Sequence, residues 1–407
     1  MREMASFGIK DIRNIVLLGH SGCGKTSLAE AILFDAGAVP KPGSVDFGTT
    51  VSDYNEDERQ KKHSIGSSIV SFVSDSKKVN IIDTPGYTDF VGEIVGALRA
   101  VETSLIVVNG AGGIEIGTER GYKMSADKDV PRVFFINRLD KENSDFEKCV
   151  DAINKKFGKS CVAVTYPVGK ESALKGVVNL ITREGMDAVP DARACLDALS
   201  EAVAETDDAL LEKYLEKGEL SREDVSGALV RAIAEGKVCP ILCGSAVKNI
   251  GVKELLDFIL KYMPSPADRP DVEVSGPSGT EKVRIKMKAE GPFAALVFKT
   301  LSDPFLGQIS IFKVFYGKLQ SNTGFYNVTR GTREKIGGLF SLMGKAQTPV
   351  ESVQAGDIIC VAKLKETETG DSIGDDKHPT KFDEIQFPQP AISFCLKPKT
   401  RADEDKI

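Results

Sequence analysis

The sequence predicts an α/β domain with a mainly parallel sheet and helices on both faces, followed by a β-barrel domain. Three observations support this fold class. Near-continuous apolar strands alternate with helical stretches in the first part, a glycine-rich turn lies near the start, and short strands separated by turn residues follow residue 276. Apolar strands that alternate with helices are typical of a parallel sheet covered on both faces.

Composition excludes several classes of protein. The chain has 407 residues, which suggests two or three domains, and its net charge of −6 argues against a basic nucleic-acid binder. No apolar run approaches the roughly 18 residues of a membrane span, and the start has no signal-peptide core. Eight scattered cysteines indicate core thiols, and three histidines cannot form a histidine-rich metal site. We therefore expect a cytoplasmic monomer without membrane or DNA partners.

The first domain is predicted over residues 1–264 from the order of its elements. Apolar strands are expected at 14–18, 79–82, 105–108, 133–136 and 240–243. A helix is expected at 26–36, where Gly37 ends it. Residues from about 145 to 235 interrupt this alternation of strands and helices and are interpreted as an inserted subdomain. It would hold a short strand at 175–181 and two helical stretches, near 194–217 and 221–235, the second capped by Ser221 with Asp224 three residues on.

The organisation of the second half is predicted from the proline, glycine and asparagine residues that separate its segments. The proline-rich stretch 265–275 is expected to be a linker. Residues 276–386 are expected to form the β-barrel, with short strands at 294–298, 309–314 and 357–361 between glycine, proline and asparagine turns. The prolines at 388 and 390 mark another boundary. Residues 387–407, with a strand at 391–395, would begin a third domain that is truncated here.

A strand-to-helix turn from Gly19 to Thr26 carries the most informative motif. Its Gly-x-x-x-x-Gly-Lys-Thr spacing is that of a P-loop, in which backbone N–H groups and a helix N-terminus surround phosphates. Lys25 can reach the β- and γ-phosphates, and the Thr26 hydroxyl can reach Mg²⁺. A glycine-rich turn without a ligand is the alternative. The residues expected at the phosphates are Gly19, His20, Ser21, Gly22, Cys23, Gly24, Lys25, Thr26 and Ser27.

Asp83 and Gly86 follow the strand at 79–82. The Asp83 carboxylate can hold Mg²⁺ through water, and the Gly86 N–H can donate to the γ-phosphate. This pattern is weak by itself, because many turns resemble it. It gains weight after a P-loop, because the two strands can then be sheet neighbours whose carboxyl ends meet at one edge.

Two later loops would bind the base. Asp140 can accept two hydrogen bonds from the guanine edge, whereas adenine presents the wrong pattern, and Asn137 would tie this loop to the P-loop. The loop after the strand at 240–243 would add backbone N–H groups to the guanine carbonyl. The residues expected at the base are Asn137, Arg138, Asp140, Ser245, Ala246 and Val247. Four loops in this order, each at a strand's carboxyl end, predict a site for GTP or GDP with Mg²⁺.

Together these motifs resemble those of the translational GTPases, and specifically elongation factor G. Residues 53–58 resemble the family's acidic stretch ahead of its first switch, and residues 303–305 and 356–357 resemble its β-barrel domain. Residues 387–390 and 397–400 resemble the opening of its third domain. The resemblance implies a GTP-hydrolysing factor that acts on the ribosome, and a longer parent protein cut after its first two domains.

Departures from the family pattern concern hydrolysis. Tyr87 stands where the family has the histidine that positions the attacking water, and tyrosine cannot act in the same way at neutral pH. Gly22 replaces an aspartate, and Arg138 replaces a lysine but can still stack on guanine. Ser64 keeps a hydroxyl for Mg²⁺ in the first switch. The resemblance thus implies catalytic roles for Lys25, Gly86 and Tyr87 and a metal site of Thr26, Ser64 and Asp83. The tyrosine makes the chain most similar to the divergent elongation factor G-like proteins of bacteria.

Three functions fit these features. The first is a ribosome-associated GTPase that is slow without a partner because Tyr87 replaces the histidine. The second is a GTP-gated switch that occupies the factor site of the ribosome with little turnover. The third is a ribosomal protection-type factor. Tyr87 argues against the third, because those relatives resemble elongation factor G in keeping the histidine.

Overall fold

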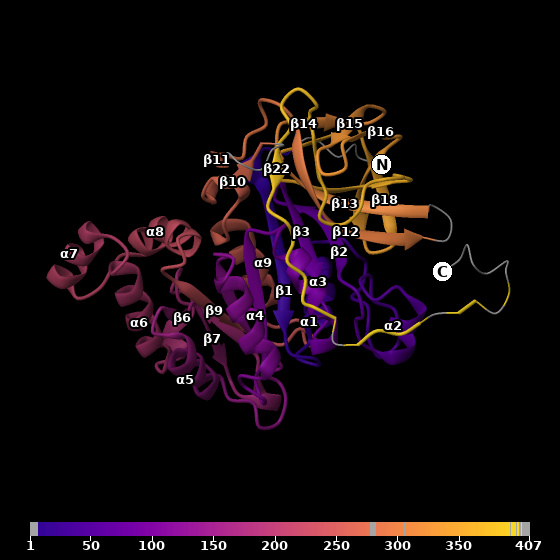
Figure 1. The fold of residues 1–407 in the computed structure, drawn as a ribbon. Helices are drawn as coiled ribbons and strands as arrows, with labels where there is room; N and C mark the ends of the chain where they lie inside the picture. Colours follow the sequence, from indigo (N-terminus) through magenta and orange to yellow (C-terminus); the bar gives the residue numbers. More distant parts are fainter. Residues whose placement is uncertain are drawn as a thin grey trace.

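The computed structural model describes residues 7–276, 282–303, 307–390, 392–395, 397–398 and 400. An α/β body occupies the centre, a helical extension lies at the left of Figure 1, and a β-rich body lies at the upper right. Positions 304, 305, 391 and 399, which belong to segments named above, lie outside the described residues. Within the described ranges, no helix has the length and apolar character needed to cross a membrane.

A parallel sheet forms the centre of the α/β body. Every residue of its strand Ile12–Gly19 is buried, and apart from Arg13 and Asn14 the strand is apolar, as expected of a strand covered on both faces. The parallel neighbours run in the order β3 (Lys77–Asp83), β1 (Ile12–Gly19), β4 (Thr103–Asn109), β5 (Arg132–Asn137), β9 (Cys239–Cys243) and β6 (Cys161–Ala163). Strand β2 (Ser68–Ser74), which the sequence did not predict, runs antiparallel to β3.

Helices cover this sheet and position its loops. Helix α1 (Lys25–Asp35) packs on β1, β3 and α9 (Val252–Tyr262), whereas α4 (Ile116–Ala126) packs on β1, β4 and β5. The remaining helices of this body are α2 (Glu56–Lys61), α3 (Val91–Ala97) and α5 (Phe146–Phe157). Short 3₁₀ turns occur at Ile9–Asp11, Thr88–Phe90, Glu171–Ala173, Met186–Ala188 and Pro266–Asp268.

The predicted insert differs from the structure in two respects. Strand β6 pairs in parallel with β9, so residues 146–163 are continuous with the main sheet. The stretch 194–217 is two helices, because the first ends at Ala204 and Asp207 caps the second by accepting from the Ala209 N–H at 3.0 Å. Ser221 caps the third helix as predicted. This region holds the hairpin β7 (Thr165–Val168) and β8 (Gly176–Asn179), then α6 (Ala192–Ala204), α7 (Asp208–Lys217) and α8 (Arg222–Ala234).

The β-rich body has its own core and also packs against the α/β body. In β12 (Ala294–Asp303), Ala295 and Val297 face the barrel core, whereas Ala294, Leu296 and Phe298 belong to the core of the α/β body. Strand residues alternate between faces, so β12 is buried on both sides over residues 294–299. The other strands are β13 (Gly307–Tyr316), β14 (Lys318–Gln320), β15 (Gly324–Asn327), β16 (Thr332–Lys335), β17 (Leu339–Met343), β18 (Ala346–Val350), β19 (Ser352–Gln354), β20 (Ile358–Ala362) and β21 (Ser372–Gly374).

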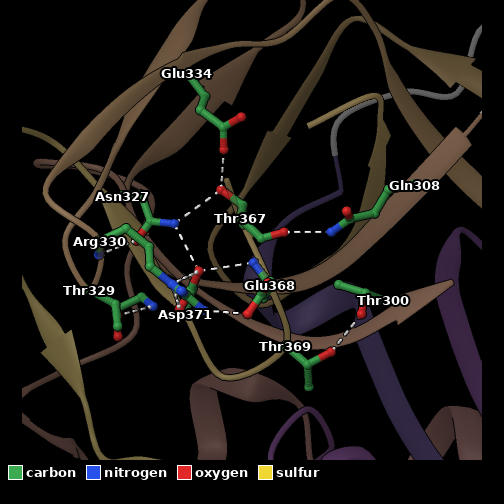
Figure 2. A network of polar contacts seen from close by, with 11 residues as sticks. Thr300, Gln308, Asn327, Thr329, Arg330, Glu334, Thr367, Glu368, Thr369 and Asp371 are labelled. Atoms are coloured by element: carbon green, nitrogen blue, oxygen red, sulfur yellow. Dashed lines mark hydrogen bonds and ion pairs between the residues drawn. The ribbon is translucent and has the colours of Figure 1, made fainter. Parts of the chain in front are cut away.

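A polar network fixes the loop before β21 to the barrel (Figure 2). Asp371 accepts from Asn327 Nδ2 and from the Glu368 N–H, both at 2.9 Å, and also pairs with Arg330. The Thr367 carbonyl accepts from Gln308 Nε2 at 2.6 Å. Since Asp371 and Thr367 are buried, these bonds satisfy polar groups that would otherwise be costly to bury.

Strand pairing and buried ion pairs join the two bodies. Met343 of β17 pairs with Val70 of β2, and the Gly344 N–H donates to the Ile69 carbonyl at 2.9 Å. Lys313 of β13 forms a buried ion pair with Glu102, and Lys78 of β3 contacts Asp357 at 2.8 Å. The two bodies therefore share one sheet, with buried charges between them.

The segments flanking the barrel also differ from the predictions. The predicted linker contains strand β10 (Val272–Ser275), which pairs with β11 (Lys282–Ile285) and β22 (Lys381–Phe382). No strand forms at residues 392–395, the described part of the predicted 391–395 strand. The chain after β22, yellow in Figure 1, runs back along the α/β body, where the Arg99 guanidinium donates to the Asp383 carbonyl at 3.1 Å.

Candidate functional site

The turn between β1 and α1 adopts a conformation that requires glycine. Gly22 and Gly24 have φ of 77° and 94°, in the left-handed region. A Cβ on Gly24 would lie 2.5 Å from Asn137 Nδ2, so a side chain there would collide with the neighbouring loop. Lys25 is only 6% exposed, and its ammonium donates to the carbonyls of Gly19 and His20 at 3.1 Å. The positive charge is thus held inside the turn.

A cavity of about 500 Å³ lies in front of this turn. Its volume is within the range of roughly 300–1,000 Å³ that small-molecule sites occupy. The walls come from the turn, from the segment at 42–46, from the loops after α2 and β3, and from the loops after β5 and β9. The predicted residues that line it are Ser21, Gly22, Gly24, Lys25, Thr26, Ser27, Ser64, Gly86, Tyr87, Arg138, Ala246 and Val247.

Thr26, Ser64 and Asp83 come together at one end of the cavity. The Thr26 hydroxyl donates to Asp83 Oδ2 at 2.7 Å and lies 3.2 Å from Ser64 Oγ. Asp83 Oδ1 is buried and makes no hydrogen bond in the described part of the chain. Burial raises the pKa of Asp83, although the Thr26 hydroxyl and Lys25 oppose that shift. A carboxylate oxygen left without a partner beside two hydroxyls is a donor set that suits Mg²⁺.

Asp53 adds a second carboxylate to this end of the cavity. Burial and then the charge of Asp83 raise the pKa of Asp53 to about 7. Two buried carboxylates that repel each other favour a bound cation, which would relieve both charges. The described residues hold no cluster of three or more His, Cys, Asp or Glu side chains fit for a metal. The set here depends instead on hydroxyls, as Mg²⁺ sites completed by phosphates and water often do.

Asn137 connects the loops at the other end. Its Nδ2 donates to the Cys23 carbonyl at 3.0 Å, which is the predicted tie to the turn. Its Oδ1 accepts from the Ala246 N–H at 2.9 Å, so that N–H is already engaged within the protein. Asp140 Oδ1 accepts from Ser245 Oγ at 2.7 Å, and the Asp140 side chain is only 5% exposed. The Asn137 amide and the Asp140 carboxylate thus hold three loops together.

The remaining predicted residues are not among those that line the cavity. Those that do not line it are Gly19, His20, Cys23, Asp83, Asn137, Asp140 and Ser245. The His20 ring faces the start of α4, where its Nε2 lies 3.6 Å from Glu115. Burial raises the pKa of the Cys23 thiol, which makes it an unreactive core group.

Sequence models of known families match both bodies of the chain. Residues 10–265 match the Elongation factor Tu GTP binding domain, and residues 292–376 match Elongation factor G domain 2. The chain belongs to the translational GTPases of the elongation factor G type.

A solved structure supports this membership. A crystal structure of a protein from Thermus thermophilus superposes with a TM-score of 0.83 and is 28% identical. The match covers 98% of this GTPase chain and 59% of the solved chain. The chain therefore spans about three-fifths of the length of the solved protein that it matches.

The two switch loops of this GTPase meet at the cavity. A Cβ on Gly86 would lie 2.6 Å from both Lys25 Nζ and the Ser21 backbone nitrogen, so only glycine fits where the second loop presses on the turn. Tyr87 is 44% exposed, and its ring lies 4.7 Å from that of His63, centroid to centroid. Tyr87, from the loop after β3, is thus in ring contact with His63, from the loop after α2.

Several residues of the cavity wall were not predicted as site residues. They are Pro42, Gly43, Ser44, Val45, Asp46, Asp53, Lys62 and His63. Glu30 of α1 holds the segment at 42–51 in place, because its carboxylate accepts from the Gly43 N–H at 2.7 Å and from the Val51 N–H at 2.6 Å. The family's acidic stretch pointed to Asp53, but no sequence pattern marked residues 42–46.

Proposed function

We propose that this chain binds GTP and GDP with Mg²⁺, hydrolyses GTP to GDP and phosphate, and acts on the ribosome. The main observation behind this proposal is that the P-loop, both switch loops and both base loops line the same cavity. We also propose that the protein is a monomer and is located in the cytoplasm. The proposal further includes a division into a GTP-binding domain at 1–264, a stretch at 265–275 that contains strand β10, a β-barrel domain to residue 386 and the start of a further domain.

The phosphate end has a residue for each role. Backbone N–H groups of the P-loop and the N-terminus of α1 would surround the β- and γ-phosphates, and Lys25 would turn its ammonium toward them from the carbonyls it now contacts. Thr26, Ser64 and Asp83 would hold Mg²⁺, whose charge stabilises the phosphates during transfer. Gly86 would donate its N–H to the γ-phosphate.

The base end would select guanine. Asp140 would accept two hydrogen bonds from the guanine edge, and Ser245, which donates to this carboxylate, would keep it oriented. Arg138 would stack on the ring from the cavity wall. The loop at 245–247 would present its N–H groups to the guanine carbonyl, although that of Ala246 is shared with Asn137.

Hydrolysis with and without ribosomes tests the proposal. We expect slow turnover of GTP by the chain alone, because the family's positioned histidine contributes roughly 100-fold or more and Tyr87 replaces it. The measurement is phosphate release in the presence and absence of ribosomes, with competition between GTP and ATP for binding. Failure to bind GTP at micromolar concentration, or equal binding of ATP, contradicts the assignment of Asp140. Fast hydrolysis by the chain alone contradicts the role given to Tyr87.

The tyrosine also favours a second candidate, a GTP-gated switch that occupies the ribosome with little turnover. In that case Tyr87→His should raise ribosome-stimulated hydrolysis by roughly 100-fold, because the water-positioning group would be restored. The measurement is the single-turnover rate of the variant beside that of the wild type. An unchanged rate excludes the switch as defined here and indicates that another residue positions the water.

A further inference from the structure

His63 of the first switch loop lies beside Tyr87 of the second, where the family resemblance leads us to expect a histidine. His63 directly precedes Ser64, one of the hydroxyls at the metal end, and both His63 and Tyr87 line the cavity together with Lys25 and Gly86. The rings of His63 and Tyr87 are tilted by 58° with their centroids 4.7 Å apart. The tyrosine ring therefore supports the imidazole at the cavity wall.

The backbone fixes which nitrogen of His63 is free. Helix α2 ends at Lys61, and Lys62 has φ of 56°, which turns the chain sharply before His63. His63 Nδ1 lies 3.0 Å from the Lys61 carbonyl oxygen. A carbonyl oxygen can only accept, so Nδ1 carries the proton and Nε2 of the neutral ring is left as an acceptor. An acceptor at this wall can take a hydrogen bond from a water molecule in the cavity.

We infer that His63 positions the attacking water when ribosomes stimulate hydrolysis by this GTPase, in the role that the family resemblance gives to a histidine at position 87. The inference rests on the proposed function. The water oxygen forms a bond to the γ-phosphorus, and the bond from that phosphorus to the bridging oxygen breaks, so that GDP leaves with the electron pair. Both water protons end on the released phosphate, one on the attacking oxygen and the other on a former γ-phosphate oxygen, from which it can pass to solvent. His63 Nε2 accepts a hydrogen bond from the water throughout and is not itself consumed.

The other polar groups near this wall have different tasks. Ser64 and Asp53 lie at the metal end, and Lys25 is a donor without a lone pair to offer. The Tyr87 hydroxyl belongs to the ring in contact with His63, and a phenol oxygen can also accept from water. The experiment therefore has to separate the imidazole nitrogen from the phenol oxygen.

The test is single-turnover hydrolysis at saturating GTP and Mg²⁺, with and without ribosomes, using the whole chain. His63→Phe keeps a ring against Tyr87 but removes both nitrogens, and we expect a rate roughly 100-fold lower. Its affinities for GTP and GDP should stay within about threefold of the wild type, because the missing group acts only on the water. His63→Gln keeps a side-chain acceptor and should retain more activity than His63→Phe. His378→Phe, at an exposed histidine of the β-rich body, is the matched control and should leave the rate unchanged.

A second arm uses position 87. Tyr87→His in the His63→Phe background should restore most of the lost rate, whereas Tyr87→Phe alone should lose less than His63→Phe. An unchanged rate in His63→Phe, or an equal loss in Tyr87→Phe, overturns the inference and leaves the proposed function standing. A wild-type chain that binds GTP but never hydrolyses it, even with ribosomes, overturns both. Unfolding curves of each variant separate a lost fold from a lost water contact.

Discussion

Asn137 illustrates how one side chain organises this site. Its amide donates to the turn at Cys23 and accepts from Ala246, so three loops distant in the sequence are fixed by one group. These bonds and the one from the Arg138 N–H all join Asn137 to backbone groups of the chain itself. The proposed base site is therefore preorganised, and binding would not have to order these loops, which reduces the entropic cost of association.

Gly86 gives a prediction at the same scale. Gly86→Ala would place a Cβ 2.6 Å from Lys25 Nζ and from the Ser21 nitrogen, so the second switch loop would have to move away from the turn. We expect GTP hydrolysis to fall at least roughly tenfold, because the γ-phosphate would lose its N–H donor. GDP binding should change little. Phosphate release and GDP titration measure the two effects.

The control is Gly227→Ala in α8, where a Cβ would meet nothing within 4 Å. This change should leave hydrolysis unchanged and stabilise the helix by up to about 1 kcal/mol. Hydrolysis by Gly86→Ala at the wild-type rate would contradict the close approach of the second loop.

The residue types of the phosphate site were predictable because their spacing reflects a local requirement. A strand, a tight turn and a helix N-terminus must follow one another, so Gly24, Lys25 and Thr26 are set by adjacent sequence. The contact between His63 and Tyr87 has no such signal. It depends on how two separate loops fold over the same cavity, which spacing along the chain does not encode.

At the scale of elements, helix α1 does more than carry the P-loop. Its Glu30 is buried, and its carboxylate holds the segment at 42–51 by two backbone hydrogen bonds. Burial raises the pKa of Glu30, and the bonds from Val51 and Gly43 counteract this shift. The cavity wall at 42–46 is thus anchored from the helix behind it.

Glu30→Gln tests this anchor. A neutral amide has one acceptor oxygen, so either the Gly43 or the Val51 N–H loses a charge-assisted bond, at a cost of about 1.5–3 kcal/mol. We expect that loss in the free energy of unfolding and roughly tenfold weaker GDP binding. Urea unfolding and GDP titration measure the two. Glu119→Gln, at an exposed ion pair with Lys156, is the control and should change neither by a measurable amount.

The strands that carry the site were predicted to within a few residues because both of their faces are apolar. Helix boundaries in the insert were harder, since Asp207 is compatible with a continuous helix as well as with a cap. Strand β2 escaped prediction because its serines interrupt the apolar pattern at Ser68, Ser71 and Ser74. Ser71 is tolerated in the core because it donates to Asn80 at 2.6 Å, a bond between strands that the sequence does not reveal.

At the scale of the whole molecule, buried charges hold the two bodies together. Lys313 and Glu102 form an ion pair across the interface, with only 2% of each side chain exposed. Burial lowers the pKa of Lys313, while the charge of Glu102 raises it. Glu102 also accepts from Asn14 Nδ2 at 2.6 Å, which connects the pair to strand β1. The sequence indicated two domains but not this contact, since it depends on which face of each strand meets the other body.

Lys313→Met tests the interface. Removal of the lysine leaves the Glu102 charge buried without its partner, and we expect the free energy of unfolding to fall by about 3–5 kcal/mol. The double variant with Glu102→Gln keeps an acceptor for Asn14 and should recover part of the loss. Denaturant unfolding of the single and double variants gives the comparison. Equal stability of the wild type and Lys313→Met would mean that the ion pair contributes little to docking.

The pairing of β17 with β2 has a consequence for aggregation. An uncovered outer strand offers unpaired N–H and C=O groups to any other chain with a free strand. Here Met343 and Gly344 of the β-rich body cover β2 at Val70 and Ile69. A fragment that ends near residue 264 would expose this apolar edge, so the second body protects the first from edge-to-edge association as well as extending its sheet.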